Sequence, residues 1–266
     1  MNLGICTLAS SSSGNCYIIK SDTTVLVLDI GVTAKKLNAD LAVMGLSPKD
    51  IDGILITHEH IDHIKGLKTL MKQTDCSVFM SEGTQAAYIK KNSTIPYQRL
   101  STIVAGNRYI IGDIEVTPFN VSHDTAEPVA FSFRRNGTKI SVVTDTGYIS
   151  EEIFENIKDS DILVIEANHE RNILLYGRYP YSLKYRILSD EGHLSNEACA
   201  DAIVRILKEN DSCPTILLAH LSRENNTPAQ AMITVRNAIE ENGFYIGSDL
   251  ELSVIEPDTM SEIKVI

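Results

Sequence analysis

A short apolar run that ends in a group of histidines constrains the fold of this chain more than any other feature. The apolar residues of segment 52–58 are contiguous rather than alternating, which is typical of a strand buried on both faces. A sheet with such strands needs helices over its faces. We therefore expect the polar residues that follow the run at one edge of a helix-covered sheet.

Strand-like and helix-like segments alternate along the rest of the chain. We expect further strands at residues 3–9, 16–20, 24–30, 129–135, 138–144, 161–167, 215–220 and 250–256, and two short ones around Gly112 within 107–119. We expect helices at residues 33–45, 62–72, 83–91, 150–157, 195–209 and 228–242. Asn136 and Gly137, which stand between two strand-like runs, predict a hairpin.

This order of elements predicts an α/β fold in which helices lie outside packed sheets. The sequence has no internal repeat and no obvious linker, so we expect a single domain over residues 1–266. Residues 168–194 show no clean period, and we expect a functional loop or a disordered segment there.

Composition narrows the class of protein. Apolar residues make up 43% and charged residues 22% of the 266 residues, which excludes an intrinsically disordered chain. The net charge of −11 argues against a protein that coats nucleic acid with its whole surface. The five cysteines are scattered and form no CxxC pair, which indicates reduced thiols and a cytoplasmic protein. We expect no membrane-spanning segment and no signal peptide.

The segment 57–63 combines three histidines with an aspartate. His58 and His60 are two residues apart, so in extended backbone their side chains point to the same side. Asp62 and His63 follow at the turn into the next helix. Imidazole and carboxylate groups are ligands that a divalent metal such as zinc prefers. The segment predicts a metal site, and the alternative is a polar helix start with unrelated histidines.

The HxHxDH pattern after an apolar strand resembles the metallo-β-lactamase superfamily. Later segments resemble further motifs of this superfamily in the same order, namely Val-Ser-His123, Val-Thr-Asp145-Thr-Gly and Leu-Leu-Ala-His220. The resemblance implies an αβ/βα four-layer sandwich of two packed mixed sheets with helices outside. It also implies two divalent metal ions, Zn²⁺ or Mn²⁺, of which the first is held by His58, His60, His123 and Asp145, and the second by Asp62, His63, Asp145 and His220.

Each weaker motif also has an interpretation without a metal. Asp145 could form a turn before Thr-Gly, and His220 could cap a helix or lie in the core. Asp29, at the end of an early strand, matches a structural aspartate of the superfamily better than a ligand. His60 stands where members with two irons and redox chemistry carry a glutamate, which favours hydrolysis.

Two further segments resemble the nucleic-acid-processing branch of the superfamily. Strand 161–167 contains Glu166 near its end, and His193 lies in the segment Gly-His-Leu-Ser before a helix. The resemblance implies that the two residues form a catalytic pair beside the metals, with Asp62 as a further catalytic residue. Glu166 and His193 would orient the attacking water and protonate the leaving oxygen. The alternative is that Glu166 is a surface cap and that His193 is a polar residue at the start of the helix.

The closest resemblance is to the bacterial YycJ/WalJ family, small metallo-hydrolases associated with 5′-to-3′ DNA exonuclease activity. The segments that carry it are 8–16, 58–63, 166–169, 192–196 and 220–226. It implies substrate contacts by residues of these segments, namely Ser12, Ser13, Asn15, His169, Ser195, Asn196, Ser222 and Asn225. For the serine-rich segment 10–13, a flexible turn is an equally good interpretation.

Basic and aromatic residues are interleaved in the expected loop. Between residues 171 and 189 the chain has no acidic residue, four tyrosines and four basic residues, Arg171, Arg178, Lys184 and Arg186. This pattern is typical of a nucleic-acid-binding segment, since cations contact phosphates and rings stack on bases. We expect Arg178, Lys184 and Arg186 to bind substrate, and the alternative is a mobile loop whose tyrosines pack on the body.

The main hypothesis is a two-metal phosphodiesterase that acts on nucleic acid, specifically a 5′-to-3′ DNA exonuclease in which a metal-bound hydroxide attacks phosphorus. Only 74 residues separate Asp145 from His220, which leaves no room for the inserted domain of the β-CASP nucleases. The alternatives are a small-molecule thioester or lactone hydrolase on the same metals, and a non-catalytic scaffold.

Overall fold

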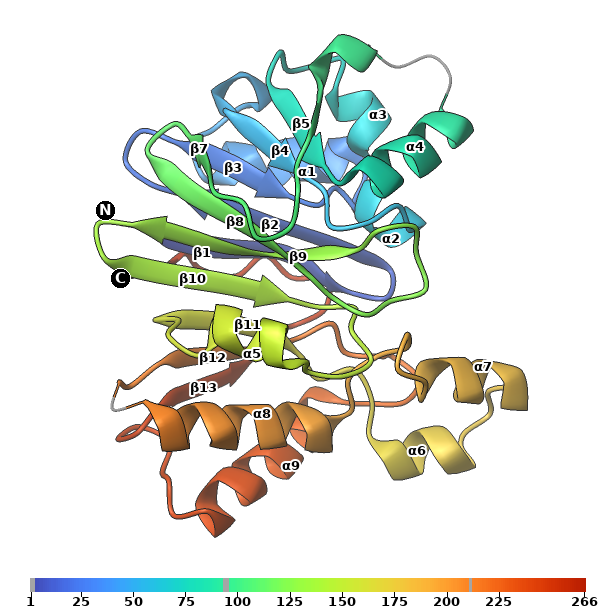
Figure 1. Cartoon of the computed structure of the whole chain (residues 1–266), viewed down its shortest axis with the longest axis vertical. Coiled ribbons are helices and arrows are strands. Elements are labelled where there is room, and N and C mark those ends of the chain that lie inside the picture. Colours follow the sequence, from blue (N-terminus) through green and yellow to red (C-terminus); the bar gives the residue numbers. More distant parts are fainter. Residues whose placement is uncertain (1–2, 93–95, 211) are drawn as a thin grey trace. The chain divides into compact units, whose positions relative to one another are not determined.

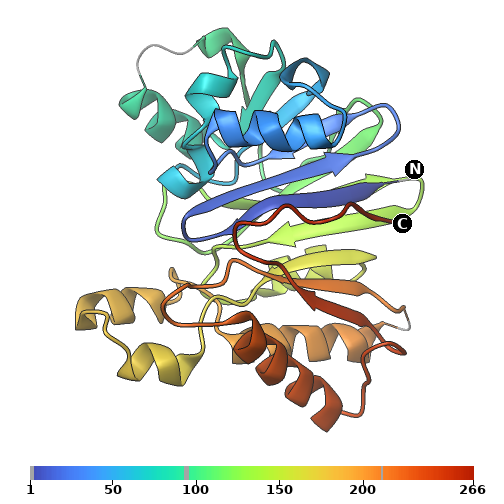
Figure 2. The same ribbon diagram turned by 180° about the vertical axis from the view of Figure 1, so that it is seen from behind.

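The computed structural model describes residues 3–92, 96–210 and 212–266. The chain divides into two compact units (Figures 1 and 2). Unit 1 comprises residues 1–120, 125–138 and 258–266, and unit 2 comprises residues 121–124 and 139–257. The single domain expected from the sequence stays a prediction.

A seven-stranded mixed sheet forms most of unit 1. Its strands lie in the order β14 (Lys264–Val265), β1 (Gly4–Ser11), β2 (Gly14–Lys20), β3 (Val25–Leu28), β4 (Gly53–Leu55), β5 (Ser77–Met80) and β6 (Leu100–Thr102). Strands β14 to β3 pair antiparallel, and β3 to β6 pair parallel. The contiguous apolar run predicted as a buried strand is β4, whose three residues are all buried.

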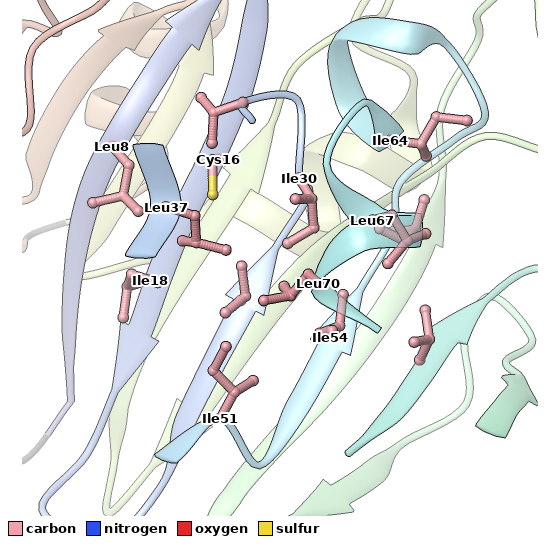
Figure 3. Packing of buried hydrophobic residues seen from close by; sticks show 14 of the residues in the cluster. Leu8, Cys16, Ile18, Ile30, Leu37, Ile51, Ile54, Ile64, Leu67 and Leu70 are labelled. Carbon is pink, nitrogen blue, oxygen red and sulfur yellow. The ribbon is translucent and has the colours of Figure 1, made fainter. Parts of the chain in front are cut away.

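Helices α1 (Ala34–Val43) and α3 (Leu67–Leu70) pack on this sheet. Leu37 and Leu67 are fully buried in one cluster with strand residues such as Leu8, Ile18 and Ile54 (Figure 3). Each such side chain stabilises the fold by roughly 1.5–3 kcal/mol through its removal from water. Unit 1 also contains α2 (Ile61–Ile64), α4 (Glu82–Lys91) and short 3-10 turns at Pro48–Asp50 and Tyr97–Arg99.

Three antiparallel strands form a second layer of unit 1, β7 (Tyr109–Ile111), β8 (Ile114–Asn120) and β9 (Val129–Arg135). A Cβ atom on Gly53 of β4 would lie 3.2 Å from the Ile111 side chain of β7, so the two layers are in close contact there. The turn residues Asn136 and Gly137 have φ of 49° and 86°, as a two-residue hairpin turn of type I′ requires.

Unit 2 is built on four parallel strands, β10 (Thr138–Val143), β11 (Ile162–Glu166), β12 (Thr215–Ala219) and β13 (Glu251–Val254). Helices α8 (Asn196–Glu209) and α9 (Pro228–Glu241) lie side by side, and α5 (Glu151–Ile157) precedes β11. The Ser195 and Thr227 hydroxyls accept hydrogen bonds from the first turns of α8 and α9, as N-caps do.

Residues 168–194 contain two short helices rather than an irregular loop, α6 (Arg171–Tyr176) and α7 (Tyr181–Ile187). Each helix buries a single residue, Leu174 in α6 and Ile187 in α7. One buried residue per helix leaves no apolar period, which is why the sequence does not predict them.

The fold agrees with the α/β class predicted from the sequence. The predicted strands and helices are present within a few residues of their expected bounds, with two exceptions. The single helix expected at 62–72 is two short helices, α2 and α3, separated by Lys65 and Gly66, and β5, β6 and β14 are not among the expected strands. The last strand of the chain is β14, which follows β13. Among the described residues, no helix is long and apolar enough to cross a membrane.

Helix α1 offers a matched pair of substitutions that tests this packing. Leu41 is fully buried, whereas Val43 is 78% exposed on the same helix. Leu41→Ala should lower the free energy of unfolding by about 2–5 kcal/mol, since it leaves a cavity, and Val43→Ala should change it by less than about 0.5 kcal/mol. Urea denaturation measures both values. Equal losses would contradict the assignment of the buried face.

Candidate metal and catalytic site

The histidine segment of unit 1 lies at the carboxyl end of β4 and runs into α2. His60 is the N-cap residue of α2, so the chain turns between His58 and His63. The ring centroid of His58 lies 4.8 Å from that of His60 and 4.0 Å from that of His63. Asp62 Oδ2 lies 3.6 Å from His63 Nε2. The turn thus brings the three predicted imidazole ligands and the carboxylate together, with His58 and His63 buried.

Asp29 supports this segment from the end of β3. Its Oδ2 atom lies 2.8 Å from His63 Nδ1, and its two oxygens accept hydrogen bonds from the backbone and the hydroxyl of Thr57 at 2.9 Å. Burial raises the pKa of Asp29, although His63 and Thr57 oppose that shift. A carboxylate on Nδ1 fixes the ring and leaves Nε2 for a ligand, which agrees with the structural role expected for Asp29.

Asn15 and Gly31 also contact this segment. Asn15 Nδ2 lies 3.0 Å from His63 Nε2 and 3.1 Å from the carbonyl oxygen of Ser11, so Asn15 contacts a predicted ligand. The backbone of Gly31 donates to the carbonyl oxygen of Asn15, and a Cβ atom on Gly31 would lie 1.6 Å from the carbonyl oxygen of Asp62. Only glycine fits at that close approach.

Unit 2 gathers a second group of site residues at the carboxyl ends of its strands. Asp145 follows β10, Glu166 ends β11 and His220 follows β12, because neighbouring parallel strands end at the same edge of a sheet. Together with His193 they offer ligand atoms that all lie within 4.8 Å of one another. Asp145 Oδ1 is 3.6 Å from His220 Nδ1, and it is 3.8 Å from the Nε2 atom of His123.

Glu166 has four hydrogen-bonding neighbours within this group and its flanking backbone. Its Oε1 atom lies 2.9 Å from His193 Nδ1 and 2.7 Å from His220 Nδ1. Its Oε2 atom accepts hydrogen bonds from the backbones of Thr146 and Leu194, both at 3.1 Å. Burial alone would raise the pKa of Glu166, but the two imidazoles outweigh it and hold the pKa well below its usual range. Glu166 is therefore an ionised, fully buried carboxylate that orients two histidines.

Two residues of this group have a left-handed backbone. Asp145 and His220 have φ of 59° and 54°, which is uncommon for residues other than glycine. The Nδ2 atom of Asn168 donates to the carbonyl oxygen of His220 at 2.8 Å, and the backbone of Gly147 donates to the carbonyl oxygen of Ser122. These hydrogen bonds hold the strained turns, and Asn168 is a supporting residue that sequence reasoning missed.

His193 and His123 are linked through the segment 187–192. The backbone of His193 donates to the carbonyl oxygen of Ile187 at 3.0 Å, and His123 Nδ1 lies 3.1 Å from the carbonyl oxygen of Gly192. The ring centroids of His123 and His193 are 5.1 Å apart. Burial lowers the pKa of His123, and a neutral imidazole is the form that binds metal.

Several residues predicted to contact substrate form a buried network instead of an open surface. His169, Asn196, Ser222 and Asn225 are buried. Asn196 Nδ2 donates to Glu170 Oε2 at 3.2 Å and to Asn226 Oδ1 at 3.1 Å. Ser195 caps α8, while Ser12 and Ser13 are exposed at the turn between β1 and β2. Substrate contact by these residues stays a prediction.

Two of the three predicted basic contacts have partners within unit 2. Lys184 Nζ donates to the carbonyl oxygens of Leu175 and Gly177, both at 2.7 Å. Arg186 forms a bidentate ion pair with Asp124, at 2.5 and 2.8 Å. Arg178 is exposed. No local sequence signal identifies these partners, because they are up to 62 residues away in the chain.

The residues of both groups fit divalent metal ions by their chemistry. They supply imidazole nitrogens and carboxylate oxygens, and in each unit a buried carboxylate holds the Nδ1 atom of a histidine and leaves Nε2 for a ligand. A metal at His63 Nε2 would replace the contact of that atom with Asn15.

Comparison with known proteins identifies the family. The model of the beta-lactamase superfamily domain matches residues 26–215. Exodeoxyribonuclease YycJ from Bacillus anthracis is 39% identical over 266 residues, which cover 100% of both chains. Exodeoxyribonuclease WalJ from Streptococcus pneumoniae is 36% identical over 261 residues, which cover 97% of this chain and 96% of the relative.

A solved structure agrees with this comparison. The metallo-beta-lactamase fold protein YhfI from Bacillus subtilis has a TM-score of 0.71 at 14% identity, over 98% of this chain and 100% of YhfI. The chain therefore belongs to the beta-lactamase superfamily and, within it, to the family of YycJ and WalJ. Membership confirms the predicted family, the predicted fold and a hydrolase that depends on divalent metal ions.

Replacement of Glu166 tests its double role. Glu166→Gln keeps the shape of the side chain but replaces one carboxylate oxygen by an NH₂ group. This group cannot accept a hydrogen bond, so one of the histidine or backbone donors loses its acceptor. We expect the free energy of unfolding to fall by about 1–3 kcal/mol and the metal affinity to fall about 10- to 100-fold, as measured by competition with a chelator. Glu170→Gln is the matched control, a buried glutamate in the same unit whose Oε2 contacts Asn196 and Thr234. An equal loss of metal affinity in both variants would contradict the role of Glu166.

His169 predicts a pH dependence of stability. Both of its ring nitrogens are buried without a hydrogen-bond partner among the described residues, and burial lowers its pKa from 6.5 to about 4. As the pH falls from 6.5 towards 4, the unfolded chain binds a proton that the native protein does not. The free energy of unfolding should therefore fall by up to about 1.4 kcal/mol per pH unit. His169→Gln should flatten this part of the pH profile in urea denaturation, and an unchanged profile would contradict the shift.

Proposed function

We propose that this protein is an exodeoxyribonuclease that hydrolyses phosphodiester bonds of DNA in the 5′-to-3′ direction. The observation that carries the proposal is the 39% identity over the whole chain to a relative named as an exodeoxyribonuclease. The Glu166–His193 pair supports it, since the leaving oxygen of a phosphodiester needs a proton. The direction of cleavage is carried by the family resemblance. The cytoplasmic location also stays a proposal.

The proposed metal ligands are those that the family resemblance implies, namely His58, His60, Asp62, His63, His123, Asp145 and His220. Zinc and manganese both accept this donor set. Two such ions activate water and offset the charge that develops on a phosphate.

His193 would act as the general acid. Its Nδ1 atom lies 2.9 Å from Glu166 Oε1, so this carboxylate orients the ring and leaves Nε2 as the atom that would pass a proton to the leaving oxygen. His193 is also the most exposed member of its group, with a side chain 16% exposed. A thioester hydrolase would have less use for this pair, because a thiolate leaves without protonation, whereas the alkoxide that leaves a DNA phosphodiester needs a proton.

Leaving-group dependence tests this role. His193→Ala should keep both metals and lower the rate on DNA by about 10²-fold to 10⁴-fold, because this is the usual contribution of a general acid to the rate. A substrate with a p-nitrophenolate leaving group needs little protonation, so its rate should fall much less. Steady-state rates on end-labelled DNA and on bis-p-nitrophenyl phosphate, with metal content by mass spectrometry, give the comparison.

Three outcomes would contradict the proposal. Equal loss on both substrates would remove the general-acid role of His193, and loss of a metal ion would make His193 a ligand. If the wild-type protein with zinc or manganese hydrolysed thioesters but not DNA, the proposed function itself would be wrong.

A further inference from the structure

Three tyrosines on α6 and α7 are unusually exposed. We call residues 171–188 the tyrosine hairpin, since α6 and α7 are joined by a short turn. Tyr176, Tyr181 and Tyr185 are 88%, 90% and 79% exposed. Tyr181 and Tyr185 are four residues apart in α7, so they lie on the same face of that helix. Large aromatic side chains that remain this open usually contact something else.

Lys184 fixes the backbone that carries these rings. Its ammonium group donates to the carbonyl oxygens of Leu175 and Gly177, the neighbours of Tyr176. These carbonyls lie at the end of α6, where backbone acceptors lack partners within the helix. The same contact joins α7 to the end of α6. Tyr185 is the residue after Lys184 in α7, so its backbone is held by this contact as well. The hairpin therefore presents the tyrosines on a structured support.

The charges of the hairpin favour base stacking over phosphate binding as the main contact. Arg186 is exposed but paired with Asp124, and Lys184 is engaged with carbonyl oxygens, so Arg171 and Arg178 are the exposed cations that no such contact engages. Two cations provide only a small electrostatic contribution to binding. No acidic residue lies between residues 171 and 189, so a phosphate backbone meets no repulsion within the hairpin. Exposed rings beside positive charges are typical of surfaces that bind single strands.

The hairpin is joined directly to the proposed general acid. The last residue of α7, Ile187, accepts a hydrogen bond from the backbone of His193 at 3.0 Å. A Cβ atom on Gly192 would lie 2.2 Å from the same carbonyl oxygen. The end of α7 therefore contacts the segment that carries His193.

We propose that the tyrosine hairpin binds unpaired nucleotides of the DNA strand by stacking on Tyr176, Tyr181 and Tyr185, and that a duplex end must open before it is cleaved. Bases inside a duplex already stack on their neighbours, so only unpaired bases can stack on these rings. The inference rests on the proposed function and names the form of its substrate.

Binding to unhydrolysable DNA is the first test. Fluorescence anisotropy of the metal-loaded protein with phosphorothioate oligonucleotides should show tighter binding to a single strand than to a blunt duplex. Tyr181→Ala and Tyr185→Ala should each weaken single-strand binding about fivefold or more, and Tyr185→Phe should retain it. Tyr245→Ala is the matched control, since Tyr245 is 60% exposed outside the hairpin. Equal effects of the hairpin and control variants would overturn the proposal.

Cleavage of different DNA ends is the second test. The double variant Tyr181→Ala/Tyr185→Ala should lose more activity on a blunt duplex than on a duplex with an unpaired 5′ end. A blunt end must first open, and in the variant the opened bases can no longer be stabilised by stacking on the two tyrosines. Its activity on bis-p-nitrophenyl phosphate should stay unchanged. Equal losses on both DNA ends would overturn the proposal. Failure of the wild-type protein on all DNA would instead refute the proposed function.

Self-association is the competing use of this surface. Sedimentation of the wild-type protein and of the double variant distinguishes self-association from DNA binding. If the tyrosines bind DNA, both proteins should have the same mass in the absence of DNA. A smaller mass for the variant would show that the tyrosines contact a second copy of the chain, and would overturn the proposal.

Discussion

The buried carboxylate of Glu166 sets the geometry on which the candidate site depends. It is fully buried at the end of β11. Its Oε2 atom accepts hydrogen bonds from the backbones of Thr146 and Leu194, and its Oε1 atom contacts the Nδ1 atoms of His193 and His220. A buried anion is costly unless donors surround it, so the four contacts stabilise the ionised form. In the proposed mechanism, this one carboxylate would orient His220 as a metal ligand and His193 as the general acid.

Strained backbone at strand ends is a second shared feature of the two units. Asp29, Asp145 and His220 each follow a strand in the left-handed region, at φ of 54–59°. Glycine would adopt this conformation without strain, but it offers no ligand atom. The cost, of order 1 kcal/mol or more per residue, is offset by local hydrogen bonds, such as that from Asn168 to the carbonyl oxygen of His220. Strain of this kind is typical of sites where side-chain direction matters more than stability.

Sequence reasoning predicted the parts of the structure that depend on local patterns. The apolar runs and the order of the motifs lie within short segments, so the sequence alone predicted the main elements and the family. The short helices α6 and α7 have one buried residue each and gave no period. The contact of Glu166 with His220 and the pairing of Arg186 with Asp124 join residues 54 and 62 positions apart. Such contacts depend on the tertiary fold, so the residues could be named from their motifs but their partners could not.

Anomalous diffraction from crystals grown with manganese or zinc tests the central claim most directly, because it locates each ion and its ligands. The account predicts two ions that share Asp145, with His220 bound through Nε2 and with His193 bound to neither ion. It also predicts that Glu166 keeps its contacts with the Nδ1 atoms of both histidines. An ion bound to His193, or the absence of ions from both groups of histidines in metal-grown crystals, would contradict the account.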